Sequence, residues 1–187
     1  MGNNNIPSAL TIYSRAILFT IGCLLWGTPA FALDLVLKDT PAQVYFSPKG
    51  GAQDAIAKTI AEAKDAIYVQ AYSFTSAPIA EALVGAYKRG IKIVAILDKS
   101  QKTERYSGAS FLANAGITVL IDDAHAIAHN KVMIIDGKTV ITGSFNFTKG
   151  AEEKNAENLM ILENSELANV YMENWEKHRK HSEEYTR

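Results

Sequence analysis

The chain has 187 residues, a formal charge of −1 and one cysteine, and 48% of its residues are hydrophobic. That length suits one domain with a hydrophobic core of its own. The charge argues against a strongly basic nucleic-acid-binding protein, and the cysteine count excludes a disulfide-stapled fold and a cysteine-rich zinc finger.

The first 32 residues are typical of an export signal. Arg15 precedes the apolar run Ala16 to Trp26, and Ala30-Phe31-Ala32 supplies small residues at the positions that a signal peptidase reads. We expect cleavage after Ala32, which would leave residues 33–187 as a single domain with a formal charge of −2 and no cysteine. An uncleaved membrane anchor is the weaker alternative, because about eleven apolar residues are too few to cross a hydrocarbon layer of roughly 30 Å.

Strand-like and helix-like stretches alternate from residue 33 onward. Ile56 and Ile60 share one helical face, and Ser76 can cap a helix that has Pro78 in its first turn. The predicted elements, in chain order, are a strand at Val44–Phe46, a helix at Gln53–Ala63, a strand at Ile67–Phe74, a helix from Ser76 to Gly90, a strand at Ile91–Leu97, a helix at Ser110–Ala115, a strand at Ile117–Ile121, a hairpin, a strand at Asn158–Leu162 and a helix at Ser165–Lys180. This βαβ alternation predicts an α/β fold, with a mixed but mostly parallel sheet flanked by helices on both faces.

The stretch from His129 to Asn146 predicts the hairpin, because Asp136-Gly137 lies between two strand-like runs. If Asp136 and Gly137 are the two central turn residues, the pairing that follows sets His129 opposite Ser144. Since side chains alternate along a strand, this register would gather four polar residues on one face of the sheet. These residues are His129, Lys131, Ser144 and Asn146.

Such a group of side chains is suited to phosphate chemistry. An ammonium, an amide and a hydroxyl can hold a tetrahedral anion, and an imidazole can attack it or move protons. Each residue taken alone has an ordinary explanation; Asp136, for example, is favoured before Gly137 in hairpin turns. The joint spacing His-x-Lys-x4-Asp-x6-Gly-Ser-x-Asn favours a functional site.

His129-Asn130-Lys131, Asp136, Gly143-Ser144 and Asn146 resemble the HKD motif of the phospholipase D superfamily. The order of predicted elements from about Leu35 to His181 also resembles the small, single-motif bacterial endonucleases of the Nuc type. The resemblance implies a phospholipase D-like fold. It also implies that two HKD motifs act together, one histidine attacking phosphorus to give a phosphohistidine and the other protonating the leaving oxygen.

This chain contains one such motif, so the resemblance predicts a homodimer in which His129 of each subunit faces a shared phosphate. Lys131 and Asn146 would hold the non-bridging oxygens, and Ser144 would contact the phosphate or the histidine environment. Glu157 is the candidate to hold the second imidazole nitrogen. Asp136 belongs to the motif, but its place in the turn favours an architectural or indirect role. We see no metal-ligand cluster in the sequence and expect neither metal nor cofactor, so activity should survive a chelator.

These features predict a metal-independent phosphodiesterase. We favour an exported, periplasmic or secreted, sequence-nonspecific endonuclease that cleaves DNA or RNA and has no stable membrane association after signal cleavage. A phospholipase D-type lipid phosphodiesterase is the alternative, and a phosphate-binding protein without turnover is the third. Because the processed chain is weakly acidic, attraction of a nucleic acid would depend on local clusters such as Lys99, Lys102 and Arg105, or Lys149 and Lys154. We assign the basic run Lys177 to His181 to the last turn of the final helix, where cations suit the helix dipole.

Overall fold

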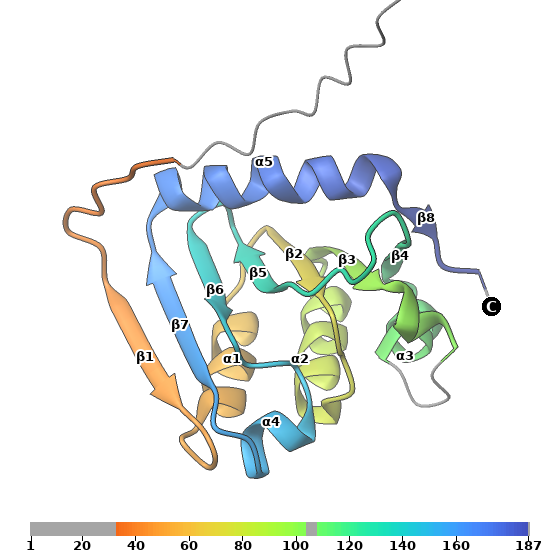
Figure 1. Cartoon of the computed structure of the whole chain (residues 1–187), viewed down its shortest axis with the longest axis horizontal. Helices are drawn as coiled ribbons and strands as arrows, with labels where there is room; N and C mark the ends of the chain where they lie inside the picture. The colour runs from red at the N-terminus through yellow and green to blue at the C-terminus, as the bar shows by residue number, and fades with distance from the viewer. Residues whose placement is uncertain (1–32, 104–107, 187) are drawn as a thin grey trace, which may run out of the picture. The chain divides into compact units, whose positions relative to one another are not determined.

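The computed structural model describes residues 33–103 and 108–186 (Figure 1). The predicted export signal and Arg105 lie outside these residues. None of the helices in the described ranges combines the length and the apolar character that a membrane span requires. The elements in chain order are β1 (Ala42–Phe46), α1 (Ala52–Ala61), β2 (Ala66–Ala71), α2 (Ala77–Lys88), β3 (Lys92–Asp98), the 3-10 helix η1 (Lys99–Lys102), α3 (Gly108–Asn114), β4 (Thr118–Asp122), β5 (Lys131–Ile135), β6 (Thr139–Gly143), α4 (Lys149–Glu153), β7 (Asn158–Glu163), α5 (Ser165–His181) and β8 (Glu183–Glu184).

The strands form one eight-stranded sheet in the order β1-β7-β6-β5-β2-β3-β4-β8. The predicted mixed sheet is confirmed, but the expectation that it is mostly parallel is wrong. Only the β2–β3 and β3–β4 pairs are parallel, and the other five pairings are antiparallel. The βαβ rhythm ends after β4, because β5, β6 and β7 pair antiparallel with their neighbours, and the edge strands β1 and β8 are antiparallel as well.

Helices cover both faces of the sheet, as predicted (Figure 1). Helices α1, α2 and α3 pack against the larger hydrophobic cluster, and α5 packs against the smaller one. Strand β5 contributes to both clusters, since Met133 and Ile135 join the first while Val132 and Ile134 join the second. The strand that begins at Lys131 is therefore held on both sides by the core.

The local signals for helices hold in the structure. Ser76 caps α2 by accepting a hydrogen bond from the backbone of Ile79, with Pro78 in the first turn. Trp175 of α5 is buried, and its indole nitrogen donates to the carbonyl oxygen of Val69 in β2 (2.9 Å). The short elements η1, α4 and β8 are additions that the sequence did not predict.

The hairpin has a different register from the one predicted. Ile135 pairs with Thr139, so the turn contains three residues, Asp136, Gly137 and Lys138. Asp136 and Gly137 both have positive φ, 55° and 59°. A shift of one residue moves every side chain of β6 to the opposite face, and the predicted pairing of His129 with Ser144 is therefore wrong.

A bulge at the end of β6 compensates in part for this shift. Gly143 has φ 146°, and the backbone N–H groups of Ser144 and Phe145 both donate to the carbonyl oxygen of Asn158 (3.1 Å each). A Cβ at Gly143 would lie 2.3 Å from that oxygen, so only glycine fits the close approach. A bulge of this kind redirects the side chains that follow it.

Candidate active site

His129 and Lys131 stand where the 123–130 connection enters β5. Lys131 is the first residue of the strand and is only 6% exposed, whereas His129 is exposed. The Lys131 ammonium donates to the carbonyl oxygen of His129 (3.0 Å) and lies 5.3 Å from the ring centre of Tyr72. The Tyr72 ring also packs on the His129 ring, with centroids 4.6 Å apart. The chain that follows β2 thus supports both predicted residues.

The Lys131 ammonium is a buried cation. Burial lowers the pKa of Lys131, and the negative charge of Glu157 opposes that shift by favouring the protonated form. A buried ammonium with one carbonyl partner can still donate two further hydrogen bonds. Such a group favours the approach of an anion.

Ser144 and Glu157 belong to one hydrogen-bonded network. The Ser144 hydroxyl donates to Oε2 of Glu157 (2.7 Å) and accepts from the backbone N–H of Asn158 (3.0 Å). Oε1 of Glu157 accepts from the amide of Asn155 (3.1 Å), and its backbone N–H donates to the Ser47 hydroxyl (3.2 Å). These bonds fix both the hydroxyl and the carboxylate.

The Glu157 carboxylate has other partners in the structure than the predicted one. Within the described part of the chain, its carboxylate bonds Ser144 and Asn155, and no hydrogen bond joins it to the imidazole of His129. The bulge places Ser144 against the start of β7, so the nearest group for the carboxylate is that hydroxyl. Glu157 contributes to the site through its charge beside Lys131 and its bond to Ser144.

Asn146 lies between two fully buried aromatic residues, Phe145 and Phe147. Its side-chain oxygen is buried and has no hydrogen-bond partner among the described residues. A buried polar atom without a partner costs about 1–3 kcal/mol, so its presence calls for an explanation such as a ligand.

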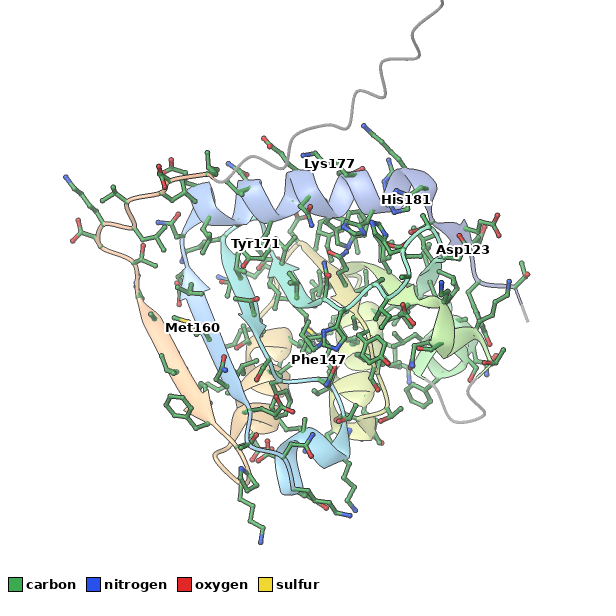
Figure 2. The ribbon with its side chains drawn as sticks, viewed as in Figure 1. Asp123, Phe147, Met160, Tyr171, Lys177 and His181 are labelled. Carbon is green, nitrogen blue, oxygen red and sulfur yellow. The ribbon has the colours of Figure 1, made fainter. Side chains whose placement is uncertain are left out.

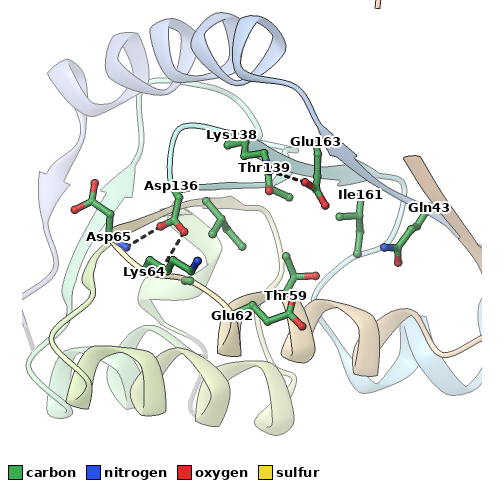
Figure 3. Close-up of a pocket in the computed structure, with 12 residues that line it drawn as sticks. Gln43, Thr59, Glu62, Lys64, Asp65, Asp136, Lys138, Thr139, Ile161 and Glu163 are labelled. Atoms are coloured by element: carbon green, nitrogen blue, oxygen red, sulfur yellow. Dashed lines mark hydrogen bonds and ion pairs between the residues drawn. The ribbon is translucent and has the colours of Figure 1, made fainter. Parts of the chain in front are cut away.

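Asp136 lies at the end of β5 opposite to Lys131. Its carboxylate accepts hydrogen bonds from the backbone N–H groups of Lys64 (2.9 Å), Asp65 (2.9 Å) and Ala66 (3.1 Å). Figure 3 shows this carboxylate turned toward the segment between α1 and β2. The pocket drawn there has none of His129, Lys131 or Asn146 in its lining. This placement favours an architectural role for Asp136.

Tyr72, Asn155 and Asn158 are parts of the site that the sequence analysis did not single out. Tyr72 lay inside the predicted strand Ile67–Phe74, and only the antiparallel pairing of β2 with β5 brings it to His129. Asn158 began a predicted strand, but the bulge in β6 also brings its backbone into hydrogen bonds with Ser144. The contacts of Tyr72 and Asn158 have no local signal in the sequence.

Four side chains that could hold a metal ion gather elsewhere in the described chain, a group that the sequence analysis did not identify. Donor atoms of Asp122, His125, His178 and His181 all lie within 4.8 Å of one another. Asp122 and His178 are 56 residues apart, so only the packing of α5 beside β4 reveals the cluster. His178 and His181 thus do more than end the final helix with positive charge.

Comparison with known proteins supports the sequence resemblance. The family model described as "Cardiolipin synthase, PLD-like domain" matches residues 56–179. A phospholipase D of Rickettsia conorii is 48% identical over 130 residues, which cover 70% of this chain but only 65% of that protein. The crystal structure of Nuc, a phospholipase D family member from Salmonella typhimurium, matches with a TM-score of 0.76 and 39% identity over 80% of this chain and all of Nuc. NucT from Helicobacter pylori shares the fold, with a TM-score of 0.73 and 24% identity over 79% of this chain and all of NucT.

Proposed function

The chain belongs to the phospholipase D superfamily, and from this premise we propose that it is an exported endonuclease that hydrolyses DNA or RNA without sequence preference. Members of the superfamily are phosphodiesterases. The observation that carries the proposal is an exposed imidazole, His129, and a buried ammonium, Lys131, which contact the same Tyr72 ring. This pair provides a nucleophile and a binding group for a phosphate.

His129 is the nucleophile in this account. No hydrogen bond ties its imidazole to another described side chain, so a ring nitrogen can reach phosphorus. As the N–P bond forms, the bond from phosphorus to the leaving oxygen breaks, and an acid on the opposite side protonates that oxygen. The same group, now deprotonated, takes a proton from a water that attacks phosphorus; the N–P bond breaks, which releases the phosphate monoester and restores the histidine.

Lys131 and Asn146 stabilise the charge that builds up on the non-bridging oxygens. The Lys131 ammonium is positioned before substrate arrives, so little reorganisation is needed as the transition state forms. The side-chain oxygen of Asn146 has no hydrogen-bond partner among the described residues, and its amide can turn an N–H group toward a phosphate oxygen because the two ends of an amide exchange by a simple rotation. Ser144, fixed by Glu157 and Asn158, shapes the same site.

A homodimer supplies the acid on the opposite side. The chain holds a single HKD motif, and a two-fold axis would place a second His129 across the phosphate. Ile127 is 58% exposed two residues before His129, and a large apolar side chain at this position suits contact with a second copy. Sedimentation of the purified protein should therefore give a dimer, and a fully active monomer would contradict this part of the proposal.

Lipid hydrolysis is the second candidate, because the relatives from Rickettsia are named phospholipase D. A lipid enzyme needs an apolar rim around its site. Large hydrophobic side chains are exposed at several places, but Ile127 alone among them lies in the segment that enters the motif. Within residues 33–103 and 108–186, these side chains are Leu33, Val36, Leu37, Val44, Phe46, Tyr87, Phe111 and Ile127. This distribution favours nucleic acid over lipid as the substrate.

One experiment separates the candidates. The purified protein is incubated in EDTA with plasmid, single-stranded DNA, RNA and phosphatidylcholine vesicles, beside His129→Ala and the exposed hairpin control Lys138→Ala. We expect wild-type protein and Lys138→Ala to cleave nucleic acid and His129→Ala to be inactive. Choline release without nucleic-acid cleavage would replace the endonuclease by the lipid enzyme. Binding of these substrates without any turnover would leave a phosphate-binding protein.

A further inference from the structure

Three of the four histidines in the chain gather around one buried aspartate, away from the HKD motif. Asp122 ends β4 and is fully buried, and His125 follows three residues later. His178 and His181 belong to the last turn of α5. Figure 2 shows His181 at the end of that helix, beside the segment after β4 that carries Asp123.

The ligand atoms converge from three directions. Nδ1 of His178 lies 2.7 Å from Oδ2 of Asp122, and Nδ1 of His125 lies 3.0 Å from both carboxylate oxygens. Nε2 of His181 lies 3.4 Å from Oδ2. In a tetrahedral zinc site with bonds of about 2.0–2.1 Å, neighbouring ligand atoms are about 3.3 Å apart. The nitrogen-to-oxygen distances of 2.7–3.4 Å lie near that value, and all four ligand atoms lie within 4.8 Å of one another.

The charge of the cluster favours a cation. Asp122 is a fully buried carboxylate, and the imidazole nitrogens of His178, His125 and His181 face its oxygens. Buried carboxylates in proteins are paired or bind metals, and each neutral imidazole offers this carboxylate only one N–H group.

The imidazole rings are also packed together. The His125 and His178 rings are stacked with centroids 4.8 Å apart, and the His178 and His181 centroids are 5.3 Å apart. Because the three rings are neighbours, their nitrogen atoms can reach one shared ion.

We propose that Asp122, His125, His178 and His181 form a structural binding site for one divalent transition-metal ion, with Zn²⁺ as the best fit. Imidazole nitrogen suits zinc and its neighbours in the transition series, whereas calcium and magnesium prefer oxygen ligands. Four protein ligands fill a tetrahedral shell, as in structural zinc sites, and leave no open position for a reacting water.

The ion would join two parts of the fold that meet beside the HKD motif. It would link the end of α5 to the 123–130 connection, which contains His129. Two further contacts already hold that connection, from Lys99 Nζ to the carbonyl oxygen of His125 (2.8 Å) and from the backbone N–H of Ala128 to Asp98 (2.7 Å). The metal would therefore stabilise the support of the motif without touching the phosphate.

Metal binding can be measured directly on the full chain. The protein is stripped with EDTA, dialysed and titrated with Zn²⁺ by calorimetry, and with Co²⁺ by visible absorption, at neutral pH. We expect one ion per chain, a Co²⁺ spectrum of the tetrahedral type and a higher melting temperature with Zn²⁺. The variant His178→Ala/His181→Ala should bind Zn²⁺ at least about 100-fold more weakly, because it retains only two of the four ligands.

Two variants serve as matched controls. His129→Ala removes the fourth histidine of the chain, and Lys180→Ala removes an exposed cation from the same turn of α5, so both should bind Zn²⁺ like the wild type. Wild-type protein that shows neither a tetrahedral Co²⁺ spectrum nor tighter Zn²⁺ binding than the double variant would overturn the proposal and leave a hydrogen-bonded network. If the double variant does not fold, the Co²⁺ spectrum of the wild type and the single variant His181→Ala still decide the question.

Discussion

The two histidine sites of this molecule differ in the charge buried beside them. His129 is exposed and stands next to the buried ammonium of Lys131, while the other three histidines surround the buried carboxylate of Asp122. The same side chain is therefore prepared for an anionic phosphate in one place and for a cation in the other. The lesson is that the buried neighbour, rather than the imidazole, decides the chemistry of a histidine.

The largest effect should come from His129→Ala. Loss of the nucleophile should lower kcat/KM for DNA at least about 10³-fold, which corresponds to about 4 kcal/mol. The melting temperature should hardly change, because the side chain is exposed. Steady-state kinetics and calorimetry measure both, with Lys138→Ala as the control. A variant that kept a tenth of the wild-type rate would rule out His129 as the nucleophile.

Lys131→Ala should lower kcat/KM by about 10²-fold to 10³-fold, the usual result of removing a donor that stabilises transition-state charge. The pH profile is the sharper test. Because burial lowers the pKa of Lys131 below its usual 10.5, rising pH should remove the ammonium, and with it activity, earlier than an ordinary lysine would. Lys131→Arg stays protonated, so its weaker activity should persist to higher pH. An alkaline limit shared by the wild type and Lys131→Arg would mean that another group titrates.

Metal removal should separate stability from activity. At a free Zn²⁺ concentration about 100 times the Kd, binding adds about 2.7 kcal/mol to the free energy of unfolding, or roughly 5–10 °C in Tm for a chain of this size. EDTA should remove this gain but leave DNA cleavage at 25 °C nearly unchanged, because the ion does not touch the phosphate. Differential scanning calorimetry and a cleavage assay on the same samples test both halves. Cleavage that stops in EDTA and returns with magnesium would contradict the metal-independent mechanism.

Asp136→Asn should give the smallest effect. The carboxylate bonds three backbone N–H groups between α1 and β2, and loss of its charge should cost about 1–2 kcal/mol of stability. Asparagine tolerates the positive φ of this position, so the turn itself should survive. kcat/KM should stay within about twofold of wild type at 25 °C. A large loss of rate without loss of stability would return Asp136 to the catalytic group.

Local features of the fold could be predicted from the sequence, because local physics determines them. Ser76 and Pro78 start α2 as expected, and the apolar run Ile91–Leu97 becomes the buried strand β3. The direction of the later strands could not be predicted in the same way, since pairing of β7 with both β1 and β6 depends on contacts distant in sequence. Local sequence signals predict individual helices and strands, but they do not predict which strands pair with one another.

In the candidate site, too, the sequence identified the residues but not the contacts that depend on the fold. The spacing of the motif identified His129, Lys131 and Asn146, but the register of the hairpin depends on whether Lys138 belongs to the turn. An Asp-Gly pair is compatible with loops of two or three residues, and the contact of Asp136 with the segment before β2 accompanies the longer one. The partner of Glu157 likewise followed from the bulge at Gly143 and not from its distance along the chain.

Trapping the covalent intermediate tests the central claim most directly. Protein in EDTA is mixed with a labelled phosphodiester, quenched under conditions that preserve phosphohistidine, digested and analysed by mass spectrometry. We predict a phosphoryl adduct on His129, at no more than about one per two chains because two subunits would share each phosphate in the proposed dimer. An adduct on His125, His178 or His181, or hydrolysis with no adduct on His129, would contradict the account.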